Sequence, residues 1–240
     1  MKQVLGGLVS LLIIFLTGCK STRVGGNNES GFVSIFDGKT LSGWEGDSTY
    51  WKVDKGCILG EVTASTLLKR NSFLIWRGGI VANFEAKVDF KVSENGNSGI
   101  NYRSEELPGI LHALKGYQAD LDGQNNYSGS NYEERARTTL AARGQKVIIP
   151  NTIDTTNQYS KYARENFWTT TDVVSSLGNN DSLESFIKNN DWNEYHLIIN
   201  GNHLQHFING KLMSEVTDND LLNLIGDTAN WRGREARFWQ

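Results

Sequence analysis

Three short strand-like runs joined by Asn-Gly pairs constrain the fold more than any other feature of the chain. The runs are 192–199, 203–208 and 211–216, and the pairs are Asn200-Gly201 and Asn209-Gly210. Asn-Gly is the strongest short-range hairpin signal, because both central residues of a type I′ turn need positive φ. The sequence therefore predicts an antiparallel three-strand meander.

Residues 83–92 predict another antiparallel strand. Apolar residues at the even positions 84–92 alternate with charged residues at 85–91, which gives one buried face and one face in water. The chain has only two prolines and 25 glycines, and its short apolar runs are separated by Gly, Asn and Asp turns. This pattern favours an all-β sandwich or barrel. Further short strand candidates are 32–36, 41–44, 51–53, 57–59 and 98–103.

One helix and one long loop interrupt this pattern. Asp181-Ser182-Leu183-Glu184 has the N-cap and N3 chemistry of a capping box, so a short helix is expected near 182–188. Residues 151–180 are polar with scattered aromatics and fit neither the helix nor the strand period. We expect there a long loop over a binding face.

The start of the chain has the pattern of an export signal. A short basic start precedes the mostly apolar run 4–16, which is too short to span a bilayer, and Leu16-Thr17-Gly18-Cys19 follows it. This tetrapeptide resembles a bacterial lipobox, whose cysteine carries the lipid of the mature protein. We expect residues 1–18 to be a lipoprotein signal peptide and 19–31 a flexible tether anchored through Cys19. The domain, residues 32–240, would then lie in the cell envelope, on the periplasmic or outer-membrane face.

Charge and composition exclude two function classes. Basic residues number 24 and acidic residues 27, and no long Lys/Arg cluster with interleaved aromatics occurs, so nucleic acid is not an expected partner. The sequence contains no paired Cys/His spacing, so a structural zinc site is not predicted. The oligomeric state does not follow from the sequence.

The stretch 116–123 carries the strongest candidate chemistry. As a strand, it places Gln118, Asp120 and Asp122 on one face and Tyr117, Ala119 and Leu121 on the other. Two carboxylates at this spacing can reach one sugar; the alternative is a solvent-facing edge strand. Retaining glycosidases of the laminarinase type have three acids at alternate positions of one strand. Here the first position is Gln118, whose neutral amide cannot attack an anomeric carbon.

Segments spread over residues 32 to about 220 resemble one known family, the 3-keto-disaccharide hydrolase domain, formerly a domain of unknown function. The matching segments include Phe36-Asp37-Gly38 with Gly43-Trp44, Asn97-Ser98-Gly99-Ile100 with Tyr102-Arg103, Gly116-Tyr117-Gln118-Ala119-Asp120, Tyr132-Glu133-Glu134, and Asp191-Trp192-Asn193-Glu194-Tyr195. Each segment alone is weak, but their order and spacing are specific. The resemblance implies a concanavalin A-like jelly-roll β-sandwich.

The resemblance also implies action on sugars oxidised to a ketone at carbon 3. The ketone acidifies the hydrogen on C2, so a base can remove it, the aglycone leaves C1 and water adds back. Asp120 and Asp122 are candidates for base and acid, or for ligands of an assisting divalent metal. Of the acidic pair at 133 and 134, Glu134 is expected to face the site. Gln118 would bind a sugar hydroxyl.

Four further residues are substrate-binding candidates: Arg103, which would stabilise the enolate, and Asn97, Tyr117 and His112. Each has an ordinary alternative, such as a surface ion pair for Arg103, core packing for Tyr117 and solvent for His112. Arg135 and Arg137 are expected to neutralise the neighbouring acids, and His206 to be structural.

Two alternatives stay open for the whole domain. Members of the family have a further strand after the segment corresponding to 218–239, so either this chain is truncated or its sheet lacks its last strand. The same fold also serves as a non-catalytic carbohydrate-binding module tethered to the envelope. An exported, lipid-anchored enzyme acting on 3-keto-glycosides is the function that the sequence favours.

Overall fold

The computed structural model describes residues 31–150 and 172–220. The predictions for the signal segment, for Cys19, for most of the loop 151–180 and for the last strand concern residues outside these ranges. The elements, in chain order, are β1 (Trp44–Glu45), β2 (Trp51–Asp54), β3 (Cys57–Gly60), β4 (Ile75–Trp76), β5 (Phe84–Phe90), β6 (Asn97–Glu106), β7 (Leu114–Asp122), β8 (Asn131–Glu134), β9 (Thr138–Ala141), β10 (Gln145–Ile149), β11 (Asp172–Ser176), α2 (Asn180–Glu184), β12 (Asn193–Asn200), β13 (His203–Ile208) and β14 (Lys211–Asp218).

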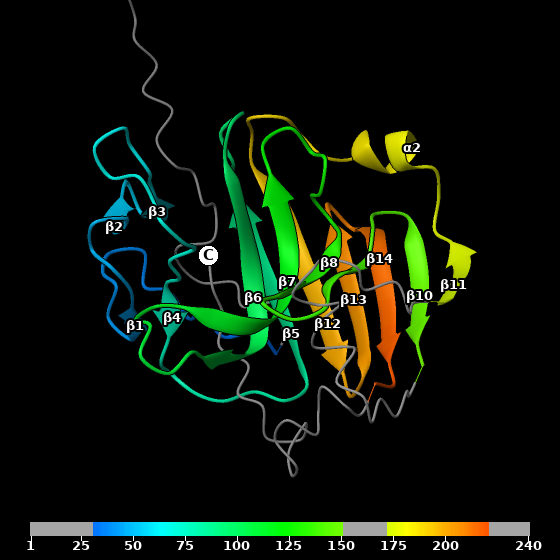
Figure 1. Cartoon of the computed structure of the whole chain (residues 1–240). Helices are drawn as coiled ribbons and strands as arrows, with labels where there is room; N and C mark the ends of the chain where they lie inside the picture. The colour runs from blue at the N-terminus through cyan, green and yellow to red at the C-terminus, as the bar shows by residue number, and fades with distance from the viewer. Residues whose placement is uncertain (1–30, 151–171, 221–240) are drawn as a thin grey trace, which may run out of the picture.

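Two facing sheets form a jelly-roll sandwich of the concanavalin A-like type, which confirms the predicted fold class (Figure 1). The larger sheet has six strands in the order β11-β10-β14-β13-β12-β5, and the smaller has four in the order β6-β7-β8-β9. Within the described residues, the strand pairings are antiparallel except that of β10 with β14. One apolar core lies between the sheets, with residues such as Ile100, Ala119, Leu197 and Val216.

The predicted meander is present as β12, β13 and β14. Asn200 pairs with His203 across the first turn, where Gly201 has a φ of 57°. Ile208 pairs with Lys211 across the second, where Asn209 and Gly210 have φ values of 49° and 77°. The second turn has the positive φ at both central residues that the Asn-Gly signal requires. In the first turn the central residues are Gly201 and Asn202, and only Gly201 has positive φ.

The alternating strand is also confirmed, as β5 at one edge of the larger sheet. Its even residues, Phe84 to Phe90, pack against the core, and its odd charged residues point away from it. In β7 the same period places Tyr117, Ala119 and Leu121 in the core. Gln118, Asp120 and Asp122 therefore lie on the outer face of the four-stranded sheet.

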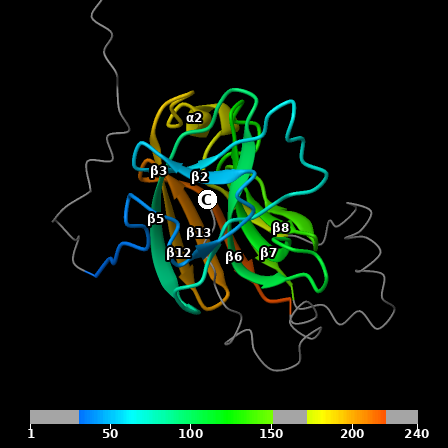
Figure 2. The same ribbon diagram turned by 90° about the vertical axis from the view of Figure 1, so that its left-hand side faces the viewer.

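The segment 44–76 covers the side of the sandwich where the edge strands β5 and β6 lie (Figures 1 and 2). It contains two small two-stranded sheets, β1-β4 and β2-β3. Phe73 and Ile75 form a second buried cluster with Leu114 at the start of β7, and the Phe73 amide donates to the His112 carbonyl at 2.9 Å. The segment therefore closes over polar residues of β6 and β7.

Three local predictions differ from the structure. Residues 172–176, part of the predicted loop 151–180, form the edge strand β11. The helix α2 begins at Asn180, and its N-cap is Asn179, whose side chain accepts from the Asp181 amide at 2.9 Å. Asp181 is therefore inside the first turn, and the predicted capping box is wrong. Residues 32–36 form no strand.

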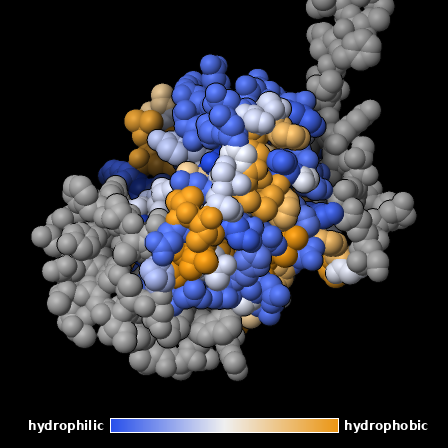
Figure 3. Space-filling model, turned by 90° about the vertical axis from the view of Figure 1, so that its right-hand side faces the viewer, coloured by the Kyte–Doolittle hydropathy of each residue, from blue (hydrophilic) through white to orange (hydrophobic). Residues whose placement is uncertain are grey.

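The opposite edge of the larger sheet is β11, where Val173 and Val174 are exposed. Figure 3 views this side of the molecule, where apolar residues lie among hydrophilic ones. No helix within residues 31–150 and 172–220 is long and apolar enough to cross a membrane.

Candidate functional site

The polar face of β7 is not a solvent-facing edge. β7 lies between β6 and β8, with Asn101 opposite Gln118 and Gly99 opposite Asp120 on one side. On the other side Tyr132 lies opposite Gln118. Residues directly opposite each other project from the same face of a sheet. Side chains from three strands therefore meet on this face, beneath the segment 44–76.

Asp120 is the most perturbed carboxyl group on this face. Its Oδ1 accepts a hydrogen bond from Gln118 Nε2 at 2.7 Å. Burial raises the pKa of Asp120 to about 7, the negative charges of Asp122 and Glu134 add to this rise, and the Gln118 hydrogen bond opposes it. A carboxyl group with this pKa accepts and donates protons near neutral pH.

Glu134 is the second carboxyl group of the outer face. It lies two residues after Tyr132 on β8, so the strand period places it on the same side. Its Oε1 accepts from Asn71 Nδ2 at 3.2 Å and lies 3.5 Å from Arg135 Nε. Burial raises the pKa of Glu134, against the charge of Arg135 and the hydrogen bond from Asn71.

The neighbouring Glu133 points to the opposite side. It is buried and pairs with Arg137, whose Nε lies 2.5 Å from Glu133 Oε2. The acidic pair of the sequence is thus divided between the two faces. Arg135 and Arg137 each contact one acid of the pair, as the sequence predicted.

Asp122 shares the face of Asp120 but has different partners. Its Oδ1 accepts from the amides of Tyr127 at 2.8 Å and Ser128 at 2.9 Å, and its Oδ2 accepts from the Asn126 amide at 2.9 Å. The carboxylate is buried and holds the loop between β7 and β8. These contacts place Asp122 as the anchor of that loop.

Arg103 and Tyr117 lie outside the outer-face cluster. A bulge between Tyr102 and Glu105, with a φ of 47° at Arg103, redirects the Arg103 side chain. Its guanidinium donates to the Ala82 carbonyl at 3.0 Å from Nε and also to the Gly201 carbonyl. Tyr117 is in the core, where its hydroxyl donates to Asp218 Oδ2 at 2.7 Å.

The two remaining candidates lie at the ends of the face. Asn97 is exposed at the start of β6, opposite Asp122. His112 lies before β7, with its Nε2 3.9 Å from Glu45 Oε1. His206, predicted to be structural, is buried, and burial lowers its pKa to about 3.

A cavity of about 280 Å³ adjoins the carboxyl groups. Its walls include Gln118 and Asn71, the two amides that donate to Asp120 and Glu134. The rest of the lining comes from the β2-β3 hairpin, the segment before Phe73, the end of β5, the start of β6, Leu121 and Trp192. It includes Trp51, Leu59, Phe90, Asn97 and Gly99. Aromatic walls with a few convergent polar groups are typical of small-molecule sites.

Asn101 is a residue of this face that sequence reasoning missed. It is 0% exposed, and among the described residues neither its Nδ2 nor its Oδ1 has a hydrogen-bond partner. In β6 the odd and even residues differ little in polarity, so the polarity pattern does not indicate which side of the strand faces the core. The register with Gln118 assigns Asn101 to the site.

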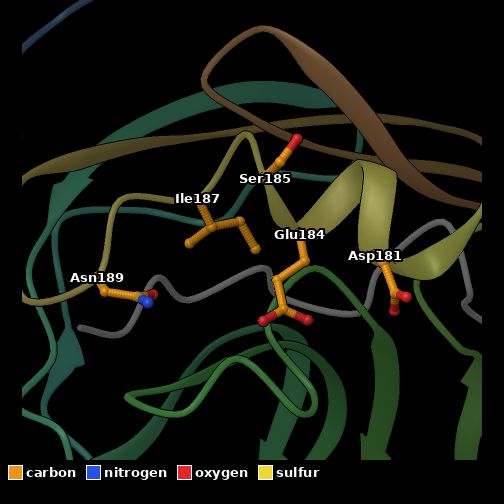
Figure 4. Close-up of a pocket in the computed structure, with 5 residues that line it drawn as sticks. All are labelled: Asp181, Glu184, Ser185, Ile187 and Asn189. Carbon is orange, nitrogen blue, oxygen red and sulfur yellow. The ribbon is translucent and has the colours of Figure 1, made fainter.

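A second cavity, of about 290 Å³, lies beside α2 and is lined by Asp181, Glu184, Ser185, Ile187 and Asn189 (Figure 4). Glu184 already binds Arg143 at 2.8 Å, and Asn189 accepts from Asn125. These contacts tie α2 to the loop after β7. Among the described residues, no group of three His, Cys, Asp or Glu side chains is placed to hold a metal ion.

Comparisons with known proteins agree with the resemblance seen in the sequence. The family model of the 3-keto-alpha-glucoside-1,2-lyase-like domain matches residues 31–226. A 3-keto-disaccharide hydrolase of Bacteroides thetaiotaomicron is 34% identical over 91 residues, which cover 32% of this chain and 29% of that protein. A crystal structure assigned as a glycosyl hydrolase, from Parabacteroides distasonis, covers 87% of this chain and 86% of its own, with 17% identity and a TM-score of 0.49. The chain belongs to the 3-keto-alpha-glucoside-1,2-lyase-like domain family.

Proposed function

We propose that this protein cleaves the glycosidic bond of 3-keto-glycosides or 3-keto-disaccharides by elimination and hydration. The observation that carries this function is Asp120, a partly buried carboxyl group with a pKa of about 7 that is hydrogen-bonded to Gln118 in the wall of an aromatic cavity. Membership of the family and the relative named as a 3-keto-disaccharide hydrolase support the substrate class.

The reaction needs one base, one acid and no enzyme nucleophile. The base removes the proton on C2, the electrons move into the C3 ketone, and an enolate forms. The enolate then expels the oxygen on C1, which takes up a proton and leaves as the free alcohol. A C1–C2 double bond remains, and water adds across it, with hydroxyl to C1 and hydrogen to C2. Gln118 stands where retaining glycosidases of the laminarinase type have their nucleophile. Its neutral amide is compatible with this route, because elimination and hydration need no enzyme nucleophile.

Asp120 relays the proton in this scheme. In its ionised form it accepts the C2 proton, and in its neutral form it gives that proton to the departing oxygen, which a pKa near 7 favours in both directions. Glu134 acts through its negative charge, which helps to keep the pKa of Asp120 raised. Asp122 has no part in proton transfer, because the backbone of its own loop occupies its oxygens.

The test measures release of 4-nitrophenol from a 3-keto-glucoside and from the matching unoxidised glucoside, with and without a chelator. Release from the keto substrate alone, reduced by about 10² or more in Asp120→Asn, is the expected result. Loss with the chelator would add a metal to the site. Sugar binding without release would indicate a carbohydrate-binding module, and hydrolysis of the unoxidised glucoside would indicate an ordinary glycosidase.

We also propose that the mature protein is anchored to the cell envelope through a lipid on Cys19. The support is the lipobox-like sequence Leu16-Thr17-Gly18-Cys19 after the apolar run 4–16. In a bacterial host the full chain should fractionate with membranes, and Cys19→Ser should release it. Equal membrane association of both forms would contradict the lipid anchor.

A further inference from the structure

Four positions of β6 and β7 form a square on the outer face of the sheet. Gly99 lies opposite Asp120, and Asn101 lies opposite Gln118. Asp120 and Asn101 are therefore diagonal neighbours, and side chains at such positions are within joint reach of one small molecule. Three corners of the square are polar, and the fourth has no side chain.

Gln118 covers the empty corner. A Cβ added at Gly99 would lie 2.6 Å from both Cγ and Cδ of Gln118, so the Gln118 side chain lies over Gly99. Both residues line the aromatic cavity, and their cross-strand partners are Asp120, opposite Gly99, and Asn101, opposite Gln118. Rotation of this flexible side chain away from Gly99 opens a slot that joins the cavity to Asp120 and Asn101.

Asn101 is unsatisfied while the slot is covered. An unpaired buried polar group costs about 1–3 kcal/mol, and native proteins rarely retain one without a reason. An apolar residue of the same shape would avoid this cost. The unpaired amide therefore points to a molecule that enters the slot and supplies its partners.

The amide has the complementary groups for an α-hydroxy ketone. Its Nδ2 has hydrogens to donate and its Oδ1 has lone pairs to accept, and both are unpaired. A 3-keto sugar presents an acceptor oxygen at C3 and hydroxyl donors on the neighbouring carbons. The oxygen at C3 becomes an anion when C2 loses its proton, and a donor preorganised in a dry site stabilises such an anion strongly.

We propose that Asn101 binds the C3 oxygen and an adjacent hydroxyl of the sugar, in the slot over Gly99 that Gln118 covers. This role rests on the proposed function and names the group that stabilises the enolate. Arg103, the candidate from the sequence, directs its guanidinium to the Ala82 and Gly201 carbonyls instead. Asn101, the diagonal neighbour of Asp120, is thus the donor to the enolate oxygen that the reaction requires.

The experiment separates enolate formation from bond cleavage. The probe is the 3-keto derivative of 1,5-anhydroglucitol, which has the C2 hydrogen and the C3 ketone but no leaving group at C1. Exchange of its C2 hydrogen in D2O, followed by proton NMR with the full-length protein, reports the base and the oxygen-binding donor alone. Release of 4-nitrophenol from the 3-keto-glucoside is measured in parallel.

Asn101→Leu is expected to slow both exchange and release by about 10²-fold, as loss of one oxyanion donor does. Its melting temperature should equal or exceed that of the wild type, because the variant removes an unsatisfied group. Ser214→Ala is the matched control, since Ser214 is also 0% exposed with an unpartnered hydroxyl but lies on β14 in the other sheet. The control should keep the wild-type rates.

Gly99→Ala tests the slot independently should Asn101→Leu fold poorly. Its Cβ would occupy the floor of the slot and displace the Gln118 side chain, so exchange should fall, and the loss of stability should be limited to the displacement of that flexible side chain. Wild-type exchange rates in both variants would overturn the role of Asn101 and leave the proposed function intact. Absence of both exchange and release in the wild type would overturn the two together.

Discussion

Two polar clusters lie on opposite sides of the four-stranded sheet, and they differ in how completely their groups are paired. On the core side, Arg137 is 2% exposed and bonds to Glu133, Asp218 and Asp220. On the outer side, the Asp120 carboxyl group accepts a hydrogen bond from Gln118, and the Asn101 side chain has no partner in the part of the chain that the structure describes. A fully paired buried cluster holds a fold together, whereas a buried cluster with unused donors and acceptors is prepared for a ligand.

Asp218, which is buried, and Asp120, which is partly buried, show the same contrast in their pKa values. Burial alone would raise the pKa of Asp218, but the charge of Arg137 and hydrogen bonds from Arg137 and Tyr117 bring it below its usual value. Burial raises the pKa of Asp120 to about 7, and within residues 31–150 and 172–220 no cation pairs with it. Burial therefore does not decide the role of a carboxyl group; its partners do.

The largest effect is expected from Arg137→Met, which breaks the core-side cluster. The substitution leaves Glu133, Asp218 and Asp220 buried without their cation, a change that typically costs about 3–5 kcal/mol. Urea unfolding followed by tryptophan fluorescence measures this loss. A decrease below about 1 kcal/mol would mean that the two clusters do not differ in structural importance.

Asp120→Asn should have the opposite effect on stability while it removes turnover. A carboxyl group whose folded pKa is raised contributes its full stability below its unfolded pKa and loses it as pH rises through the folded pKa. Raising the pKa of Asp120 from 3.8 to about 7 corresponds to up to about 4 kcal/mol, lost between these pH values. The variant should therefore melt well above the wild type at pH 8 and close to it at pH 4. Equal melting temperatures at pH 8 would show that Asp120 is ionised without strain.

Much of the fold was predictable because its signals are local. Alternation defined β5 and β7, and the Asn-Gly pairs defined the meander of β12 to β14. β8 was not predicted, since Asn131 and Glu133 are polar although both are buried. A strand whose inner face meets an ion cluster shows no hydrophobic alternation, so a pattern based on polarity fails there.

The site was predictable only in part, for geometric reasons. The strand period alone placed Gln118 and Asp120 together, and the family resemblance indicated Glu134. The positions of Arg103 and Asn101 depend on the bulge in β6 and on its register with β7, which are long-range properties. The role of Asp122 depends on the fold of the loop at 126–128, which no local pattern specifies.

The smallest effect is expected from Glu134→Gln, on the outer side of the four-stranded sheet. Glu134→Gln keeps the shape of the side chain and removes one of the negative charges that raise the pKa of Asp120. The acidic limb of the pH profile of kcat/KM, which reports Asp120 in the free enzyme, should move to lower pH, and turnover at pH 8 should fall by about tenfold or less.

Gln118→Leu should move the same limb to higher pH, because it removes the hydrogen bond that lowers the pKa of Asp120. Three other groups interact electrostatically with Asp120 or Glu134, namely Asp122, Tyr132 and Arg135, and all three are unchanged in both variants. Shifts of the acidic limb in opposite directions therefore report the two substituted groups. Shifts in the same direction would show that the limb reports a group other than Asp120.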